Sequence, residues 1–288
     1  MEPAPVTGQL AVVATPIGNL GDITQRALDT LRTADVVAAE DTRHSGQLLH
    51  HFQIDTPMLS YHEHNAASRE SELLARITAG QTVALVSDAG TPGISDPGQR
   101  LIAAARDAGL PVTVIPGPSA LITALVGSGL PTDRFTFEGF LPRKGKERAE
   151  RLAELQVDQR TVVFYESPQR LTDTLAELAK VQPERFAVVG RELTKRFETY
   201  YRGTLAELAA GFAATPARGE CVVMLAPAAP PPPDGADALA GAVSAALAAG
   251  LGVADAARQA VRLIGVPRRV AYDLALRLQQ GEPDPDDA

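Results

Sequence analysis

The segment from Val86 to Gly98 gathers carboxylates, hydroxyls and three glycines within thirteen residues, Val-Ser-Asp-Ala-Gly-Thr-Pro-Gly-Ile-Ser-Asp-Pro-Gly. Carboxylates can accept protons, and glycines let backbone amides approach a ligand closely. A plain turn would explain one or two of these residues, but not the whole set. The segment lies between an apolar and an amphipathic run, which predicts strand, loop and helix, with Pro97 at the first helical position and Ser95 or Asp96 as its cap. Such strand-end loops bind small molecules in open α/β sheets.

Three further loops of similar character follow apolar runs, over residues 14–24, 39–43 and 116–120. Each loop alone could be an ordinary turn. None matches the dinucleotide pattern G-x-G-x-x-G, and no lysine follows a glycine run as in a P-loop, so NAD and ATP sites of the usual kind are unsupported. The four loops together predict one shared small-molecule site.

Apolar runs and helical periodicity indicate the elements that position these loops. In the first part of the chain, Thr24 caps a helix that contains Ala27, Leu28 and Leu31. Strands are expected over 10–15, 36–39, 82–86 and 112–115, and helices over 44–52, 66–77 and 99–108. This alternation predicts a mostly parallel sheet covered on both sides.

The pattern restarts after Pro118. We expect helices over 119–126 and after the Ser167-Pro168 pair, and strands over 135–138, 161–165, 186–191, 197–201 and 221–225. Because several of these strands follow one another closely, the second sheet is expected to be mixed or partly antiparallel.

The predicted fold class is therefore α/β, with two α/β domains over 8–117 and 118–227 and a ligand cleft between them. A proline-rich linker over 226–234 leads to a small helical extension over 235–281, in which two helices around Gly265 resemble a helix-turn-helix. This extension could equally be a helical cap or a dimerisation arm. The acidic end, 282–288, is expected to be disordered.

Composition excludes several classes of protein. The 288 residues carry a net charge of −8, which argues against a nonspecific nucleic-acid coat but allows a local basic patch. Cys221 is the only cysteine, so neither an intrachain disulfide nor a cysteine-based zinc cluster can form. No basic-apolar leader and no long uncharged apolar run stand out, so we expect a soluble cytoplasmic protein. His62-Glu63-His64 lacks a clear third ligand, and we predict no metal.

The motifs of this chain resemble those of the tetrapyrrole-methylase superfamily, S-adenosylmethionine enzymes built from two α/β domains. The resemblance covers about residues 8 to 227 and rests on Thr15-Pro16-Ile17-Gly18-Asn19-Leu20-Gly21-Asp22, Ala39-Glu40-Asp41-Thr42-Arg43, Ser87-Asp88-Ala89-Gly90-Thr91-Pro92, Phe140-Leu141-Pro142, Tyr165-Glu166-Ser167-Pro168 and Arg191-Glu192-Leu193-Thr194-Lys195. Within the superfamily, these motifs are similar to those of the subfamily that methylates small-subunit ribosomal RNA. Precorrin-type members typically have Gly-Pro-Gly-Asp at the first loop and Gly-Asp-Pro at the third, where this chain differs.

The resemblance implies methyl transfer from S-adenosylmethionine to the 2′-hydroxyl of a cytidine ribose in the decoding region of 16S rRNA, by a homodimer acting on rRNA or the 30S particle. It implies that the cofactor lies in the cleft, close to Pro16, Ser87, Asp88, Ala89, Gly90, Thr91, Ser119, Ala120, Glu166 and Glu192.

A ribose hydroxyl is a weak acid, so a proton acceptor should assist the transfer. Superfamily relatives carry a carboxylate at the end of the second strand, which corresponds to Glu40, the first candidate. Asp41 is the second, and Lys195 is the third if burial lowers its pKa. Alternatively, Glu40 and Arg43 could form only a salt bridge or a capping pair.

A basic segment offers phosphate contacts through Arg143, Lys144, Lys146 and Arg148, although it could also be a solvated helix start. The extension over 235–281 carries a formal charge of +5 − 3 = +2, which weakly supports RNA docking. Two other functions fit the same features, namely a methylase of tetrapyrroles or other small molecules and a noncatalytic RNA-binding ribosome-assembly factor.

Overall fold

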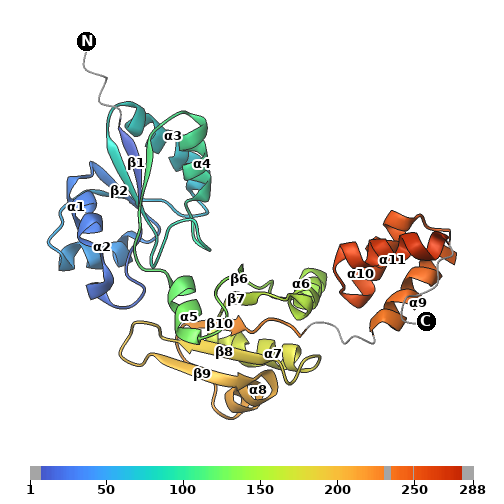
Figure 1. Cartoon of the computed structure of the whole chain (residues 1–288). Helices are drawn as coiled ribbons and strands as arrows, with labels where there is room; N and C mark the ends of the chain where they lie inside the picture. Colours follow the sequence, from blue (N-terminus) through green and yellow to red (C-terminus); the bar gives the residue numbers. More distant parts are fainter. Residues whose placement is uncertain (1–7, 230–234, 249, 281–288) are drawn as a thin grey trace. The chain divides into compact units, whose positions relative to one another are not determined.

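The computed structural model describes residues 8–229, 235–248 and 250–280. Within these ranges the chain forms two compact units (Figure 1). The first holds the described residues up to Gln156 together with Arg160–Pro227, and the second holds Val157–Gln159 and the described residues from Ala228 onward. Both predicted α/β domains therefore lie in one unit, and the boundary between 117 and 118 stays a prediction.

The first sheet is parallel throughout and has the order β3-β2-β4-β1-β5. Its strands are β1 (Gln9–Val13), β2 (Val36–Ala39), β3 (Met58–Ser60), β4 (Thr82–Val86) and β5 (Val112–Ile115). Figure 1 shows one helix pair on each face, α1 (Gln25–Thr33) with α2 (Thr42–His51), and α3 (Ala66–Thr78) with α4 (Gln99–Asp107). Separate apolar cores fill the two faces, which confirms the predicted parallel sheet covered on both sides.

The sequence predicted the N-terminus of α1 correctly and that of α4 incorrectly. Thr24 caps α1 as predicted, because its side chain accepts a hydrogen bond from the Ala27 amide at 3.1 Å. The predicted start of α4 at Pro97 is wrong, since the helix begins only at Gln99, with Gly98 as its uncapped N-terminal residue. Gly98 has φ +138°, which breaks helical continuity, and a Cβ there would lie 3.1 Å from Leu85 Cδ2. Ser95 and Asp96 are thereby left in the loop.

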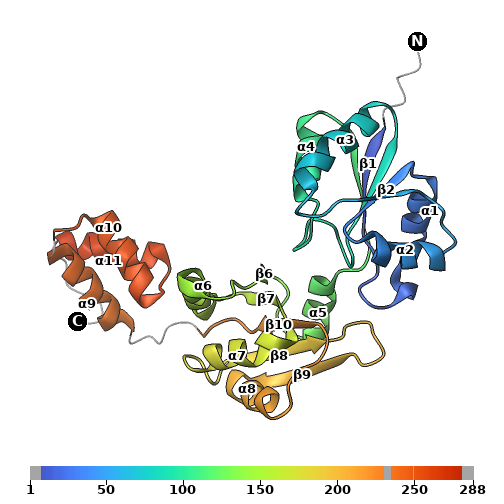
Figure 2. The ribbon, with the colours of Figure 1, turned by 180° about the vertical axis from the view of Figure 1, so that it is seen from behind.

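The second sheet is mixed, as predicted, with the order β6-β7-β10-β8-β9. Only β6 and β7 are parallel neighbours. The strands are β6 (Phe135–Phe140), β7 (Thr161–Glu166), β8 (Phe186–Arg191), β9 (Thr199–Thr204) and β10 (Cys221–Leu225). One face packs against α6 (Gly145–Val157), α7 (Pro168–Ala179) and α8 (Leu205–Ala214), and the other against α5 (Ala120–Ser128) (Figure 2). The sequence analysis did not predict β3, α8 or the full extent of α6.

In its described residues, the second unit contains three helices, α9 (Gly235–Ala248), α10 (Val253–Ile264) and α11 (Arg268–Gln280), with an apolar core of their own. Gly265 ends α10 in the left-handed region at φ +76°, as expected for a glycine C-cap. The predicted helix pair is therefore part of a three-helix unit. Most of the predicted linker, 230–234, and the acidic end, 282–288, lie outside the described residues. None of the helices in the described ranges is long and apolar enough to cross a membrane.

Candidate active site

The first unit contains a cavity of about 320 Å³ whose walls come from both sheets. The loop after β4 and the start of α5 form one side, and the inner face of the second sheet forms the other. The lining residues are Ile17, Ala89, Gly90, Thr91, Ile94, Ser95, Asp96, Ser119, Ala120, Phe140, Tyr165, Glu166, Ser167, Pro168, Leu193, Glu220, Cys221 and Val222. Its size and mostly apolar wall with a few polar groups suit a small organic ligand.

A second cavity of about 280 Å³ adjoins the first and shares Ile17, Ala89 and Glu220 with it. The loop after β1, the first turns of α2 and the start of the loop after β4 line it. The shared residues make the two cavities neighbouring compartments of one site.

Hydrogen bonds between loops hold this site together. Thr15 and Gly90 exchange two backbone hydrogen bonds of 2.9 and 3.1 Å, and the Thr15 hydroxyl donates to the Ser87 carbonyl at 3.2 Å. The Asp41 amide donates to Asp88 Oδ1 at 3.1 Å. The first three predicted loops are therefore tied to one another, and the fourth reaches the cavity through α5.

The structure distributes the predicted cofactor residues over both compartments. Six of them line the first cavity, namely Ala89, Gly90, Thr91, Ser119, Ala120 and Glu166. Ala89 also lines the second cavity, together with Pro16, Ser87 and Asp88. Glu192 lines neither, because its carboxylate accepts hydrogen bonds from Lys195 Nζ and the Glu220 amide, both at 3.0 Å.

Three carboxyl groups, Glu40, Asp88 and Asp96, lie in the loops after β2 and β4, and we call them the open acid cluster. Burial and the nearby charge of Asp88 raise the pKa of Glu40, and His62 only partly opposes this. Within the described part of the chain, the buried Glu40 Oε2 has no hydrogen-bond partner. Burial, followed by the charge of Glu40, raises the pKa of Asp96 to about 6. Asp96 is the one member of the cluster that lines the first cavity, whereas Glu40 lines neither cavity.

The other two catalytic candidates, Asp41 and Lys195, form ion pairs, although Lys195 also lines the second cavity. Asp41 caps α2 and accepts three hydrogen bonds from Arg43, which lowers the pKa of Asp41 far below its usual range. Arg43 therefore pairs with Asp41 and not with Glu40. Partial burial lowers the pKa of Lys195, but hydrogen bonds from its ammonium to Glu220 and Glu192 outweigh that effect and raise it. The condition that the sequence analysis set for Lys195 to act as a base, a lowered pKa, is therefore not met.

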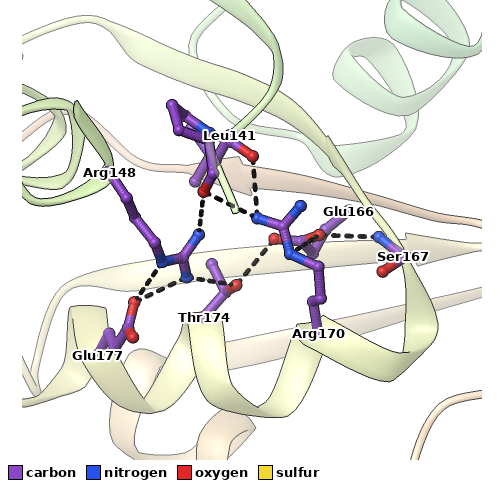
Figure 3. A network of polar contacts seen from close by, with 8 residues as sticks. Leu141, Arg148, Glu166, Ser167, Arg170, Thr174 and Glu177 are labelled. Carbon is purple, nitrogen blue, oxygen red and sulfur yellow. Dashed lines mark hydrogen bonds and ion pairs between the residues drawn. The ribbon is translucent and has the colours of Figure 1, made fainter. Parts of the chain in front are cut away.

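The basic segment divides into exposed and buried members. Arg143, Lys144 and Lys146 are exposed. Arg148 is buried, and its guanidinium donates to Glu177 Oε2, the Pro142 carbonyl and Thr174 Oγ1 at 2.7 to 3.0 Å (Figure 3). The prediction that Arg148 contacts RNA phosphate is wrong, because its nitrogens already have partners inside the protein.

Arg148 belongs to a network that reaches the cavity wall (Figure 3). Arg170 donates to the Leu141 and Pro142 carbonyls at 2.9 and 3.2 Å and lies 3.3 Å from Glu166 Oε1. Glu166 Oε2 in turn accepts from Thr174 Oγ1 at 2.8 Å. We call Arg148, Glu166, Arg170, Thr174 and Glu177 the arginine clamp. Glu166 Oε1 also accepts from the Ser167 amide at 2.9 Å, so Glu166 lines the cavity with both carboxylate oxygens already engaged inside the protein.

Several lining residues were absent from the predicted site. Asp96 lies in the loop that the sequence singled out, and Phe140 and Tyr165 lie in motifs quoted for the family resemblance. The sequence therefore drew attention to these three residues but did not predict that they line the cavity. Glu220 and Cys221 carried no local signal. They reach the cavity because β10 pairs with both β7 and β8, which are distant in sequence.

The histidine pair at 62 and 64 does not extend to a metal site. The two rings lie 6.0 Å apart, and among the described residues no group of three His, Cys, Asp or Glu side chains could hold a metal ion.

Comparison with known proteins gives matches over most of the chain. The model of the tetrapyrrole (corrin/porphyrin) methylases matches residues 9–209. The chain is 50% identical to the ribosomal RNA small subunit methyltransferase I of Synechocystis over 275 residues, which cover 94% of this chain and 99% of that protein. It is 46% identical to the protein of the same name from Escherichia coli O157:H7 over 278 residues, which cover 95% and 96% of the two chains.

Solved structures share the fold at low identity. A cobalt precorrin-4 methyltransferase aligns with a TM-score of 0.60 and 19% identity, covering 76% of this chain and 94% of that one. Uroporphyrin-III C-methyltransferase from Thermus thermophilus, in complex with S-adenosylhomocysteine, gives a TM-score of 0.54 at 20% identity, with 76% and 97% covered. A conserved hypothetical protein from Aeropyrum pernix covers 96% of this chain and all of its own, with a TM-score of 0.59 and 19% identity.

Proposed function

Since this chain belongs to the tetrapyrrole (corrin/porphyrin) methylases, we propose that it is an S-adenosylmethionine-dependent methyltransferase that methylates the 2′-hydroxyl of a cytidine ribose in the decoding region of small-subunit rRNA. The observation that carries this proposal is identity of about one half, over nearly the whole chain, to proteins named ribosomal RNA small subunit methyltransferase I. The coverage includes the second unit, so the likeness extends beyond the α/β part shared with the precorrin enzymes.

The walls of the first cavity fit S-adenosylmethionine. Ala89, Gly90, Ser119 and Ala120 leave room for close approach to backbone groups, and Gly90 has φ +77°, which other residues rarely adopt. The start of α5 has no side-chain cap and offers a positive helix end to a carboxylate. The bound cofactor supplies an activated methyl group on its sulfonium. The task of the protein is then to hold donor and acceptor in line.

For proton acceptance we propose Asp96 as the group that faces the substrate and Glu40 as the group that tunes it. A carboxylate whose pKa is near neutrality is a better proton acceptor than an ordinary exposed one. Asp96 has such a pKa and lines the cavity, while the charge of Glu40 contributes to raising it. Glu40, the first candidate of the sequence analysis, thus keeps a role, but it acts through Asp96 and does not contact the reacting hydroxyl.

For RNA docking we propose the exposed residues Arg143, Lys144 and Lys146. The second unit offers two further cations, Arg262 and Arg277, which form no ion pair within the described residues. Arg258 and Arg269, in contrast, pair with Asp255 and Asp273. Lysine and arginine bind RNA chiefly by releasing counterions from phosphates.

We also propose that the protein is a homodimer. Ile122 and Val126 on α5 are 48% and 69% exposed, and Val114 on β5 is 53% exposed, although all three are large aliphatic residues. Ile122 and Val126 lie four residues apart and so share one face of α5, and a contiguous exposed apolar patch is typical of an interface. Light scattering at micromolar concentration should give twice the chain mass, and Val126→Asp should give a monomer. A monomeric wild type would contradict the dimer.

One labelling experiment tests the proposed activity. S-adenosylmethionine with a labelled methyl group is supplied together with free rRNA, 30S particles or uroporphyrinogen-type tetrapyrroles. We expect label in RNA, in a dinucleotide that resists alkaline hydrolysis, because a methylated 2′-oxygen cannot attack the neighbouring phosphate. Label on a base or on a tetrapyrrole would contradict the proposal, as would cofactor binding without any transfer, which fits a noncatalytic assembly factor.

The cofactor site has its own test. Calorimetry should detect binding of S-adenosylhomocysteine without added metal, and the double variant Asp88→Ala, Gly90→Val should lose it. Valine at position 90 would place a branched side chain at φ +77°, with its Cβ 3.5 Å from Ile17 Cγ2. Unchanged binding in the double variant would exclude this cavity as the cofactor site.

A further inference from the structure

Phe140 is an aromatic side chain at the rim of the first cavity. It ends β6 after an irregularity in the pairing with β7 between Phe137 and Phe140, where Gly139 has φ +61°. The ring of Phe140 lines the cavity and yet is 56% exposed. Solvent exposure of a large aromatic ring forgoes the free energy that its burial would provide. A rim position of this kind suits a ligand that covers the ring.

The ring is held by other aromatic residues on the cavity wall. The Phe140 and Tyr165 rings meet edge to face, with centroids 5.5 Å apart at 60°, and Tyr165 meets Phe137 in the same way at 5.0 Å and 70°. Edge-to-face packing supports a ring while leaving a face accessible.

The arginine clamp fixes the chain directly after Phe140. Arg170 and Arg148 donate to the carbonyl oxygens of Leu141 and Pro142, and both arginines are anchored on α6 or α7 (Figure 3). The backbone of the segment that carries the ring is therefore preorganised, which lowers the entropy lost when a ligand binds.

Charge on the same segment indicates what the ligand is. Arg143, Lys144 and Lys146 follow the ring by three to six residues, and all three are exposed. An aromatic ring followed by a short run of cations matches a nucleotide strand, because bases stack on rings and phosphates attract cations. The adenine of a bound cofactor would cover the ring but would not use Arg143 and Lys144, or Lys146, which has only an exposed ion pair with Glu150 at 3.4 Å.

Building on the proposed function, we propose that Phe140 is a stacking platform for an RNA base at the methylation site, with the adjacent phosphates on the Arg143–Lys146 segment. The target nucleotide leaves the RNA stack and places its base against the exposed Phe140 ring, which presents its ribose to the cavity. Enzymes that act on a nucleotide within structured RNA or DNA commonly extrude it in this way.

A fluorescent cytidine analogue, pyrrolocytidine, tests the platform when placed at the position that the wild type methylates. Stacking on Phe140 should quench its emission on binding in the wild type and in Phe140→Trp, but not in Phe140→Ala. We expect Phe140→Ala to bind unmodified RNA about 5- to 100-fold more weakly, with a much smaller change in S-adenosylhomocysteine affinity. Phe135→Ala is the matched control, because Phe135 is an exposed phenylalanine of the same strand that lines no described cavity.

Each alternative outcome has a distinct meaning. If the wild type methylates RNA but Phe140→Ala keeps full RNA affinity and quenching, the platform is wrong and the proposed function stands. Loss of S-adenosylhomocysteine affinity instead would assign the ring to the cofactor and overturn the proposal. A positioning variant adds a check, since Arg170→Ala should also weaken quenching while Arg170→Lys, which can still donate to a carbonyl, should restore part of it.

Discussion

Two groups of charged residues each place one carboxyl group, Asp96 or Glu166, in the wall of the first cavity, and they differ in whether their charges are paired. In the open acid cluster, the charge of Asp88 raises the pKa of Glu40, the charges of Glu40 and Asp88 raise the pKa of Asp96, and Glu40 Oε2 has no hydrogen-bond partner in the described part of the chain. In the arginine clamp, each carboxylate faces an arginine, and Glu166 and Arg148 are buried with their partners in place.

This difference indicates that the open acid cluster serves catalysis, whereas the arginine clamp stabilises the fold. A cluster of like charges destabilises the folded protein, so its persistence at a cavity points to a task in catalysis. A paired network costs little once formed, but it becomes costly when one partner is removed. Substitutions in the two groups should therefore have opposite signatures in activity and in stability.

The largest effect is expected for Asp96→Asn, which removes the proposed proton acceptor with little change in shape. The single-turnover rate should fall about 10²- to 10⁴-fold, while cofactor and RNA affinities stay near the wild-type values. The folded-state pKa of Asp96 lies above its usual value of 3.8. Stability is therefore lost as the pH rises through this range toward 6. At pH 8 the variant should thus unfold at a higher temperature than the wild type, and below pH 4 this gain should vanish. If the variant were less stable than the wild type at pH 8, Asp96 would be a residue that stabilises the fold, as the clamp residues do.

Arg148→Met tests the clamp. It leaves Thr174 Oγ1 and Glu177 Oε2 without the guanidinium that donates to them, while the Pro142 carbonyl keeps its hydrogen bond from Arg170. We expect the free energy of unfolding to fall by about 2–3 kcal/mol. Lys146→Met on the same helix is the control, because Lys146 is 89% exposed and its 3.4 Å ion pair with Glu150 should contribute less than about 0.5 kcal/mol. Urea denaturation measures both. Equal losses would show that the buried arginine is not structurally special.

The exposed cations test docking separately from either group. Replacing Arg143, Lys144 and Lys146 by alanine should weaken RNA binding about tenfold at moderate salt and reduce the slope of log affinity against log salt by about 2, since fewer counterions are released. S-adenosylhomocysteine affinity serves as the control and should stay constant. If RNA affinity also stays constant, docking lies elsewhere, for example on the arginines of α10 and α11.

The smallest effect is expected for Glu40→Gln. It removes a negative charge that raises the pKa of Asp96, so the acid limb of the rate should move to lower pH. At neutral pH the rate should change about fivefold or less. A loss as large as that of Asp96→Asn would instead make Glu40 the proton acceptor, as the sequence first suggested.

Strand-end loops and capping signals made much of the fold predictable. The parallel first sheet, the mixed second sheet and the Thr24 cap depend on local periodicity and on residues a few positions apart, which a single sequence carries. The start of α4 failed because Pro97 looks like a first-turn proline, while the tight approach of Gly98 to Leu85 is a tertiary constraint.

The site was predictable as a set of loops but not as a set of roles. Arg148 and Lys144 look alike in the sequence, and only the packing of α6 against α7 buries one and exposes the other. The sequence also does not tell which carboxylate, Asp96 or Glu40, lines the first cavity, because this depends on the path of the loop after β4. Glu220 enters through long-range pairing of β10, for which the local sequence offers no signal.

The most direct test of the central claim is the pH dependence of the single-turnover methyl-transfer rate. If Asp96 accepts the proton, the wild-type rate should fall on the acid side with a midpoint near pH 6, where Asp96 becomes protonated. The residual rate of Asp96→Asn should lack this limb. The account would be contradicted if the wild type and Asp96→Asn gave the same profile with the same rate.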